Sequence, residues 1–257
     1  MSDLEIVDGF VATPQRYLWH EASGTAVVAD LHIGAEAELT RRGIFMPDIS
    51  SRALAAAWSC MVERLRERKG AGRVVIAGDL FDVPAPDADA RAAATGLMEA
   101  LPQNCQVILL CGNHDPPAPV LREWFRGLAV RVENTATVGG YTIAHGHEAE
   151  VKSAAQGGLI VGHQHPAVVL RDRVQSAKMI CYAVCKLGTE NSGPKTLIIL
   201  PSFSRAPLGG NLLTERQWII NLPRPSAAQV RIAGILEGRD IVGRVLDFGP
   251  LAGLRVG

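Results

Sequence analysis

Five short polar clusters contain most of the side chains in this 257-residue chain that could bind a metal ion or transfer a proton. In chain order they are Asp30-Leu-His32, Gly78-Asp-Leu-Phe-Asp82, Gly112-Asn-His-Asp115, His145-Gly-His147 and Gly162-His-Gln-His165. Six of the seven histidines fall in these clusters, and only His20 lies elsewhere. Any single histidine could be an ordinary loop residue, but six in one recurring pattern indicate a shared site.

The residue types in the clusters indicate which ions such a site would hold. Neutral imidazole, carboxylate and amide oxygen without thiolate suit manganese, iron or zinc, with magnesium as a further alternative. The candidate ligands are Asp30, His32, Asp79, Asn113, His145, His163 and His165. Seven ligands are enough for two ions if one carboxylate bridges them. Two ions about 3.5–4 Å apart can clamp a phosphoryl group and activate water, so we predict a two-metal phosphoesterase, with manganese favoured.

Each cluster directly follows a short apolar run. The runs are Thr25–Ala29, Arg73–Ala77, Val107–Cys111, Tyr141–Ala144 and Gly158–Val161. Runs this short and this continuously apolar are typical of strands that are buried on both faces. Functional groups gather just beyond the carboxyl ends of the strands in such sheets, so we expect the five clusters to converge.

Helical segments separate the early strands. Apolar residues recur at helical spacing from Leu54 to Leu65, Asp48 or Ser50 could cap this helix, and Gly70 could end it. A second helix is predicted from about Asp87 to Leu101. Strands that alternate with helices predict an α/β fold built as a layered sandwich.

The remainder of the chain is expected to complete the same fold. Three further strands are predicted at Val168–Arg171, Lys178–Val184 and Lys195–Leu200. The tail from Ser202 is rich in Gly and Pro and is expected to wrap around the sheet. No segment has the composition of a linker, so we predict a single domain over residues 1–257.

The five clusters, in this order, resemble the full signature of the calcineurin-like metallophosphoesterases. The motifs Asp-x-His, Gly-Asp-x-x-Asp, Gly-Asn-His-Asp, His-Gly and Gly-His-x-His agree in order and in strand context from Asp30 to His165. This resemblance implies an αββα sandwich with a mixed β-sheet core. The phrase Gly78–Asp82 and the compact length further resemble the SbcD-related branch, which includes the bacterial DNA-ligase-associated phosphoesterases. The ending Leu200–Ser204 with Gly209–Asn211 resembles that branch more weakly.

The resemblance also implies a role for each matching residue. Asp30, His32 and His165 would bind the first metal, and Asp79 would bridge. Asn113, His145 and His163 would complete the second metal site. His114 would protonate the leaving oxygen or stabilise the transition state, and Asp82 would orient His114. General-acid help of this kind is worth typically about 10²–10⁴-fold in rate.

Other residues in the clusters are expected to have structural roles. His147 matches no ligand position and is expected beside the site or at the surface. Asp115 is expected to accept hydrogen bonds from backbone N–H groups of its loop. Gly78, Gly112 and Gly162 are expected to permit tight turns and close backbone approach. The five cysteines lack zinc-type spacing and are expected to be reduced, buried core thiols.

The amino-acid composition argues against some classes of protein. Lys plus Arg equals Asp plus Glu at 26 each, which argues against strong non-specific nucleic-acid binding by the whole surface. No apolar run approaches the roughly 20 residues of a membrane span. The N-terminal sequence MSDLEIVDGF does not have the layout of a signal peptide, so we expect a cytoplasmic enzyme without membrane association.

The sequence leaves more than one class of phosphoester substrate open. Val83 and Pro84 stand where Ser/Thr protein phosphatases carry Arg-Gly, and a non-catalytic metal-binding scaffold would be expected to lack ligands that are all present here. A nuclease or phosphodiesterase linked to DNA repair therefore competes with a small-molecule phosphomonoesterase or nucleotide phosphatase. A basic strip slightly favours nucleic acid as the substrate, either single-stranded or flexible, and DNA is one such substrate. Its cations are Arg171, Arg173, Lys178, Lys186, Lys195 and Arg205, against Asp172 and Glu190. A helicase or ligase partner would fit the branch resemblance, and the oligomeric state is left open.

Overall fold

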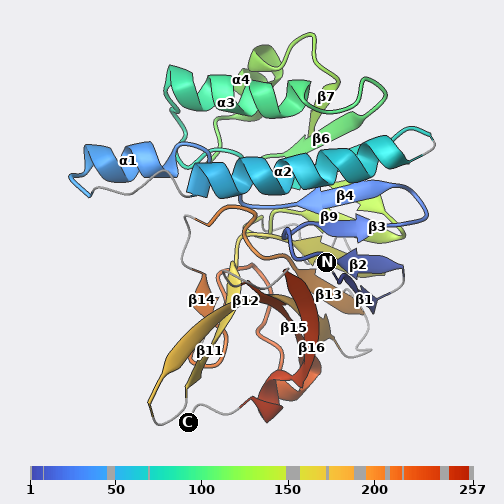
Figure 1. The fold of residues 1–257 in the computed structure, drawn as a ribbon, viewed down its shortest axis with the longest axis vertical. Coiled ribbons are helices and arrows are strands. Elements are labelled where there is room, and N and C mark those ends of the chain that lie inside the picture. Colours follow the sequence, from blue (N-terminus) through green and yellow to red (C-terminus); the bar gives the residue numbers. More distant parts are fainter. Residues whose placement is uncertain are drawn as a thin grey trace.

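The computed structural model describes residues 2–7, 9–44, 50–68, 70–148, 157–171, 174–187, 195–205, 209–215, 217–237 and 243–254. Two β-sheets pack face to face, and the α-helices cover the outer face of the first sheet (Figure 1). The α/β class predicted from the alternating strands and helices is therefore confirmed.

The first sheet is built around four parallel strands. Its seven strands lie in chain order: β1 (Leu4–Val7), β2 (Phe10–Ala12), β3 (Leu18–His20), β4 (Thr25–Val28), β5 (Arg73–Ala77), β6 (Gln106–Leu110) and β7 (Val130–Glu133). Strands β1 to β4 pair antiparallel, and β4 to β7 pair parallel. Every residue of β4 is buried, as expected for a continuously apolar strand covered on both faces.

The second sheet is mixed and holds the remaining strands. They are β8 (Ala136–Val138), β9 (Tyr141–Ala144), β10 (Gly158–Val161), β11 (Pro166–Arg171), β12 (Ser176–Lys186), β13 (Thr196–Ile199), β14 (Gly210–Asn211), β15 (Val230–Leu236) and β16 (Arg244–Pro250). Strand β10 lies between β9 and β13 and runs parallel to both. The carboxyl ends of β9, β10 and β13 therefore lie at one edge.

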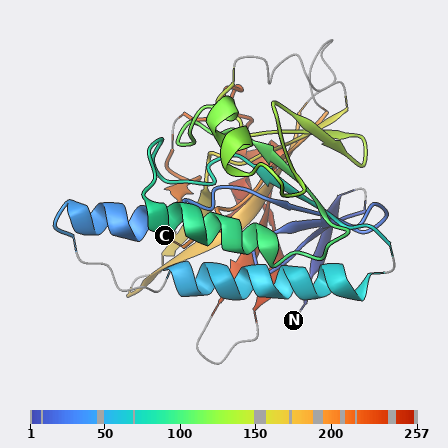
Figure 2. The same cartoon turned by 90° about the horizontal axis from the view of Figure 1, so that it is seen from above.

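Four α-helices follow strands of the first sheet: α1 (Ala35–Arg41), α2 (Ser50–Glu67), α3 (Ala88–Glu99) and α4 (Ala118–Trp124). Seen from above, α2 and α3 run side by side across the sheet (Figure 2), and Trp58 of α2 donates a 2.9 Å hydrogen bond to the Leu97 carbonyl of α3. Asp87 caps α3 by accepting a hydrogen bond from the Ala90 N–H. The periodic apolar residues of α2 are buried against the sheet, which confirms the predicted helix.

Successive side chains along each strand of the first sheet point to opposite faces, so the core has one part between the two sheets and one part under the helices. Val27 and Val75 point between the two sheets, whereas their neighbours Val28 and Val74 point toward the helices. The far face of the second sheet is covered differently from the αββα expectation. Among the described residues, 3₁₀ turns and the segment around Trp218 and Ile220 pack there, and no α-helix does.

The predicted elements agree with the structure, with some additions. The five apolar runs, the two predicted helices and the three later strands are all present. The tail contributes more than a wrapping loop, because β15 pairs with β12 and adds β16 to the sheet. The N-terminal strands β1 to β3 and the short helices α1 and α4 were not predicted. Asp48 and Arg173, which figured in those predictions, lie outside the described residues.

All five cysteines are free thiols, as predicted. Cys105, Cys181 and Cys185 are buried, whereas Cys60 and Cys111 are partly exposed. None of the described helices combines the length and the apolar character needed to cross a membrane.

Candidate metal centre

The five polar clusters meet where the two sheets face each other. Parallel pairing aligns the carboxyl ends of β4, β5 and β6 in the first sheet and of β9 and β10 in the second. Each cluster begins within two residues of one of these ends. The convergence that the sequence predicted is therefore produced by strand pairing, and it draws on both sheets.

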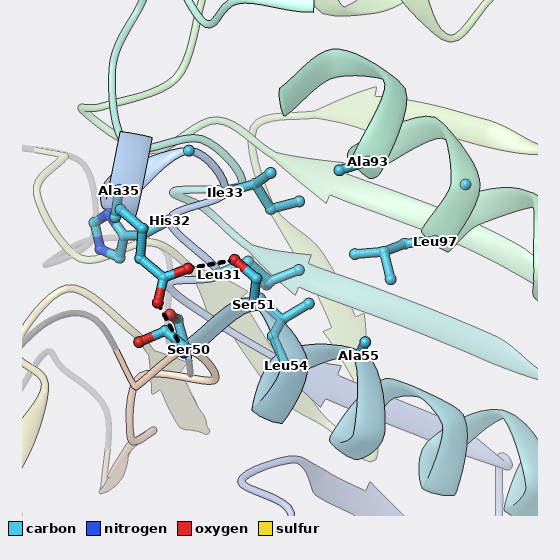
Figure 3. Close-up of a pocket in the computed structure, with 14 residues that line it drawn as sticks. Leu31, His32, Ile33, Ala35, Ser50, Ser51, Leu54, Ala55, Ala93 and Leu97 are labelled. Atoms are coloured by element: carbon cyan, nitrogen blue, oxygen red, sulfur yellow. Dashed lines mark hydrogen bonds between the residues drawn. The ribbon is translucent and has the colours of Figure 1, made fainter. Parts of the chain in front are cut away.

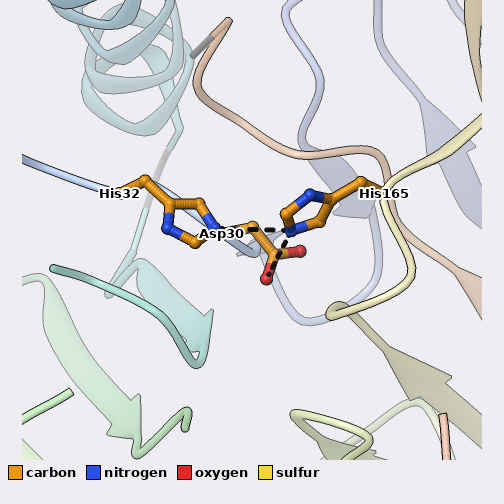
Figure 4. A group of neighbouring side chains, drawn as sticks. All are labelled: Asp30, His32 and His165. Atoms are coloured by element: carbon orange, nitrogen blue, oxygen red, sulfur yellow. Dashed lines mark hydrogen bonds and ion pairs between the residues drawn. The ribbon is translucent and has the colours of Figure 1, made fainter. Parts of the chain in front are cut away.

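Asp30, His32 and His165 form the first group of candidate ligands (Figure 4). Nε2 of His165 lies 3.3 Å from Oδ1 of Asp30 and 3.4 Å from Nε2 of His32. Two ring nitrogens that face each other beside a carboxylate can share only one proton. A cation between them satisfies all three atoms, so the donors fit a metal ion.

Asp79, His145 and His163 form the second group, and their potential ligand atoms lie within 4.8 Å of one another. Nε2 of His145 lies 3.2 Å from Oδ2 of Asp79 and 3.1 Å from Oδ1 of Asn113. Nδ1 of His145 donates a 2.9 Å hydrogen bond to the Ala77 carbonyl. Its Nε2 is thus the nitrogen directed at two acceptors, as a metal-binding imidazole requires.

Asp79 lies between the two groups. Its Oδ2 is 3.2 Å from Nε2 of His145 in the second group and 3.9 Å from Nε2 of His32 in the first. A carboxylate in this position can contact two ions at once. All seven residues predicted as ligands therefore lie close together, and their assignment to two ions stays a prediction.

His114 and Asp82 form a third group with His32, in which one ring nitrogen or carboxylate oxygen of each residue lies within 4.8 Å of the others. The contact between His114 and Asp82 nevertheless differs from the expectation. Nδ1 of His114 donates a 2.8 Å hydrogen bond to the backbone carbonyl of Asp82, not to its carboxylate. Oδ1 of Asp82 instead lies 3.1 Å from Nδ1 of His32, at an angle outside hydrogen-bond geometry. The Asp82 side chain is thus closest to a candidate ligand, and the main chain orients His114.

The turns that carry the ligands have an unusual backbone conformation. Apart from Arg16, the described residues other than glycine with positive φ are all candidate ligands: Asp30, His32, Asp79, His163 and His165. Such conformations cost on the order of 1–3 kcal/mol each and cluster at functional sites. Here the sharp turn at each strand end directs consecutive or alternate side chains into one site.

Backbone N–H groups hold the two ligand carboxylates in place. The His163 N–H donates to both oxygens of Asp30, at 3.1 and 3.0 Å. The His114 N–H donates to Oδ1 of Asp79 at 2.9 Å, which leaves Oδ2 for the ions. These contacts fix the carboxylates before any ion binds.

Glycines allow this close approach, as predicted. A Cβ on Gly112 would lie 2.0 Å from Oδ1 of Asp79, and a Cβ on Gly162 would lie 2.7 Å from Oδ2 of Asp30. Asp115 acts within the loop as expected, since its carboxylate accepts hydrogen bonds from the Phe81 and Gly112 N–H groups at 2.9 and 2.8 Å.

The electrostatics of the second group follow from burial and from the carboxylates. Burial lowers the pKa of His145, but the hydrogen bond that its ring donates to Asp79 and the charges of Asp30 and Asp79 outweigh burial and raise that pKa to about 9. Burial and the neighbouring His145 lower the pKa of His163 to about 4. Burial alone would raise the pKa of Asp79, and the hydrogen bond and charge of His145 bring it well below its usual range. The site thus concentrates negative charge where cations would bind.

Glu148 supports the second group and was not identified from the sequence. Its Oε1 accepts a 3.1 Å hydrogen bond from the His145 N–H, and its Oε2 accepts a 2.7 Å bond from the Gly146 N–H. His147 lies beside the same group, with its ring 5.2 Å from that of His145 and 6.0 Å from that of His163. His147 was expected beside the site or at the surface, and its position next to these rings agrees with that expectation.

Arg16 supports Asp30 through a segment that is distant in the sequence. Its guanidinium donates to the carbonyls of Ser202, at 3.4 Å, and Ser204, at 2.9 Å, and pairs with Glu237. The Ser202 hydroxyl in turn donates a 2.8 Å hydrogen bond to the Asp30 carbonyl. No local pattern around Arg16 indicates this role, because its partners are more than 180 residues away.

Among the residues that the structure describes, the cations of the expected basic strip do not form a continuous row. Lys178 and Lys186 lie near opposite ends of β12, roughly 26 Å apart at about 3.3 Å per residue. Lys186 pairs with Thr196 at the start of β13, the end of the sheet away from the metal centre. Arg205 forms a 2.8 Å ion pair with Glu237. These cations therefore offer no single track beside the site.

Comparisons with known proteins agree with this geometry. A profile of the calcineurin-like phosphoesterase family matches residues 25–178, which is more than half of the chain. The crystal structure of Pseudomonas putida nuclease MPE is similar in fold, with a TM-score of 0.57 and 19% identity, covering 95% of this chain and 99% of that chain. No protein with a curated description is detectably similar in sequence. The chain belongs to the calcineurin-like phosphoesterase family and is a metal-dependent phosphoester hydrolase.

Proposed function

We propose that this enzyme is a two-metal phosphodiesterase that cleaves nucleic acid. In this proposal Asp30, His32 and His165 would hold one ion. Asn113, His145 and His163 would hold the other, and Asp79 would contribute to both sites. The observation that carries the assignment is the position of Asp79, whose Oδ2 lies 3.2 Å from Nε2 of His145 and 3.9 Å from Nε2 of His32.

The chemistry divides between the ions and the protein. Two bound ions supply charge neutralisation at the phosphoryl oxygens and a lowered pKa of water. His114 is the general acid in this proposal. Because the Asp82 carbonyl accepts the Nδ1 proton of His114, Nε2 is the nitrogen that faces away from the main chain and can donate a proton to the leaving oxygen.

Two observations support nucleic acid as the substrate. The fold is similar to that of a nuclease, although at 19% identity this likeness concerns the fold alone. The phrase Gly78–Asp82 resembles a branch that acts on DNA. Manganese as the metal, a DNA-repair role, and a helicase or ligase partner are further parts of the proposal that rest on this resemblance. A phosphomonoesterase or nucleotide phosphatase is the alternative for the same site.

A substrate panel with Mn²⁺-loaded protein tests the proposal. We expect hydrolysis of bis(p-nitrophenyl) phosphate and of single-stranded DNA, with weaker hydrolysis of p-nitrophenyl phosphate. The Asp79→Asn variant should lose activity together with metal, and Glu99→Gln, at an exposed position of α3, is the control. Turnover of monoesters alone would favour the phosphatase alternative. An inert protein with two metals per chain, verified by elemental analysis, would overturn the proposal.

A further inference from the structure

An apolar cavity adjoins the metal centre. It has a volume of about 280 Å³ and lies between helices α2 and α3 and the segment that carries His32 (Figure 3). Leu31, Ile33, Leu54 and Leu97 supply much of its wall, and His32 itself forms part of the lining. A group bound in the cavity would therefore lie beside His32, a candidate ligand of the first ion. None of the roles assigned above uses this space.

Small residues on α3 keep the cavity open. Ala93 and Gly96 line it, and a Cβ added to Gly96 would meet no atom within 4 Å. Glycine in the middle of a helix costs stability relative to alanine, and an apolar cavity without an occupant loses packing contacts. Alanine in place of Gly96 would stabilise the helix of the protein alone, so this glycine is better explained by space that a ligand uses.

One end of the cavity is acidic. Oε1 of Glu36 accepts a 2.8 Å hydrogen bond from the Ser50 N–H, and Oε2 accepts a 2.6 Å bond from the Ser51 hydroxyl. Each carboxylate oxygen has a further lone pair for a donor from a ligand. An adjoining depression is lined by Asp89 and Asp87 as well as Glu36, and of these Asp87 forms a 3.0 Å ion pair with Arg41. This end would repel a phosphate and attract N–H groups.

The occupant must therefore be an apolar ring with N–H donors at one edge and a phosphate at the other end. A nucleobase has this layout, with exocyclic amino or ring N–H groups on its base-pairing edge. An acyl chain fits the apolar wall but would leave the Glu36 carboxylate facing hydrocarbon. We propose that the cavity binds one unpaired nucleobase of the nucleotide that adjoins the scissile phosphate.

This inference rests on the proposed function and narrows it. A base inside the cavity cannot be paired at the same time, so the enzyme selects single-stranded, frayed or flipped nucleotides. Apolar walls hold the ring, and Glu36 accepts from its edge. Recognition then comes from the base as well as from the phosphate, which agrees with the absence of a continuous basic track among the described cations.

Two substrates and three variants test the inference. The substrates are single-stranded oligothymidylate and an oligomer of the same length whose bases are replaced by tetrahydrofuran abasic residues. We expect the Mn²⁺-loaded wild-type enzyme to have at least a tenfold higher kcat/KM for the base-containing strand. Gly96→Leu and Ala93→Leu fill the cavity and should reduce this ratio at least tenfold, mainly through KM. Ala92→Leu, exposed on the same helix and outside the lining, should leave the ratio unchanged.

The outcomes separate the two proposals. An inert wild-type enzyme on both strands and on bis(p-nitrophenyl) phosphate would overturn the proposed function itself. A wild-type enzyme that cleaves both strands equally, or cavity variants that keep the wild-type ratio, would overturn only the base site. Better turnover of an acyl-bearing glycerophosphodiester, lost in both cavity variants, would assign the cavity to a lipid and also overturn the base site. Thermal melting checks folding, and Gly96→Leu is expected to melt at or above the wild-type temperature.

Discussion

The ring of His114 is held by the main chain of Asp82, through a 2.8 Å hydrogen bond from Nδ1 to the Asp82 carbonyl oxygen. The Asp82 carboxylate lies instead 3.1 Å from Nδ1 of His32, a candidate ligand of the first metal. A substitution of the Asp82 side chain therefore leaves the support of His114 in place and changes the surroundings of His32. The support of His114 and the contact with His32 can therefore be separated by experiment.

Asp82→Asn is expected to weaken metal binding rather than turnover. Removing the charge beside His32 should lower the affinity for the first ion by about 10–100-fold, as is typical when a partner of a metal ligand is changed. At saturating Mn²⁺, kcat should remain within about tenfold of wild type, because the carbonyl still accepts from His114. Metal titrations with activity as the readout measure both. A loss of kcat at saturating metal as large as that of a His114 variant would show that the carboxylate acts through His114.

His114→Ala is expected to lower kcat by about 10²–10⁴-fold, the usual contribution of a general acid. The metal content should remain close to two per chain, since His114 is not among the proposed ligands. Elemental analysis of the purified variant checks this, and His20→Gln, the histidine outside the clusters, is the control. Loss of one metal would instead make His114 a ligand.

Glu148→Ala is expected to weaken the second metal site. Without its carboxylate, the His145 and Gly146 N–H groups lose their acceptors and the turn that carries His145 loosens. We expect the affinity for the second ion to fall about 10–100-fold, with the first ion retained. Calorimetric titration of metal-free protein resolves the two ions. Glu133→Ala, at an exposed position of β7, is the control, and an unchanged second binding event would rule out this supporting role.

Metal binding is expected to release a proton from His145. Its pKa in the metal-free protein is about 9, above the ordinary value of 6.5, so the ring is charged at pH 7 and an ion must displace that proton. His163, with a pKa of about 4, is already neutral and releases none. Titrations in buffers of different ionisation enthalpy should therefore give about one proton from this pair at pH 7 and fewer as the pH passes 9. No release at pH 7 would contradict the charged state of His145.

The same shift predicts how the stability of the metal-free protein depends on pH. A histidine whose pKa is higher in the folded state stabilises the fold fully below the unfolded value of 6.5. This contribution is lost as the pH rises through about 9. The difference in unfolding free energy between wild type and His145→Ala, measured with denaturant in a chelating buffer, should shrink over that range. If the difference in unfolding free energy grew with pH, it would contradict the raised pKa of His145.

Much of the fold was predictable because its signals are local. Each central strand is a short apolar run buried on both faces, as in β4, so it needs no information about its partners to be recognised. Helix α2 has an apolar face at helical spacing. The N-terminal strands were not predicted because β2 and β3 are only three residues long and Glu5 interrupts the apolar run of β1. Their stability comes from pairing with one another.

The sequence by itself determined the set of candidate ligands, since polar clusters that follow apolar strands must gather at one edge of a sheet. Only the tertiary structure decided which neighbours act on them. The contacts of Arg16 with Ser204 and of Glu148 with the His145 turn depend on chain segments meeting in space or on the path of a loop. The cavity beside His32 likewise exists only where α2, α3 and the first metal-binding segment pack together. Strand ends are encoded locally, whereas contacts between distant segments are set by how the sheets and helices pack.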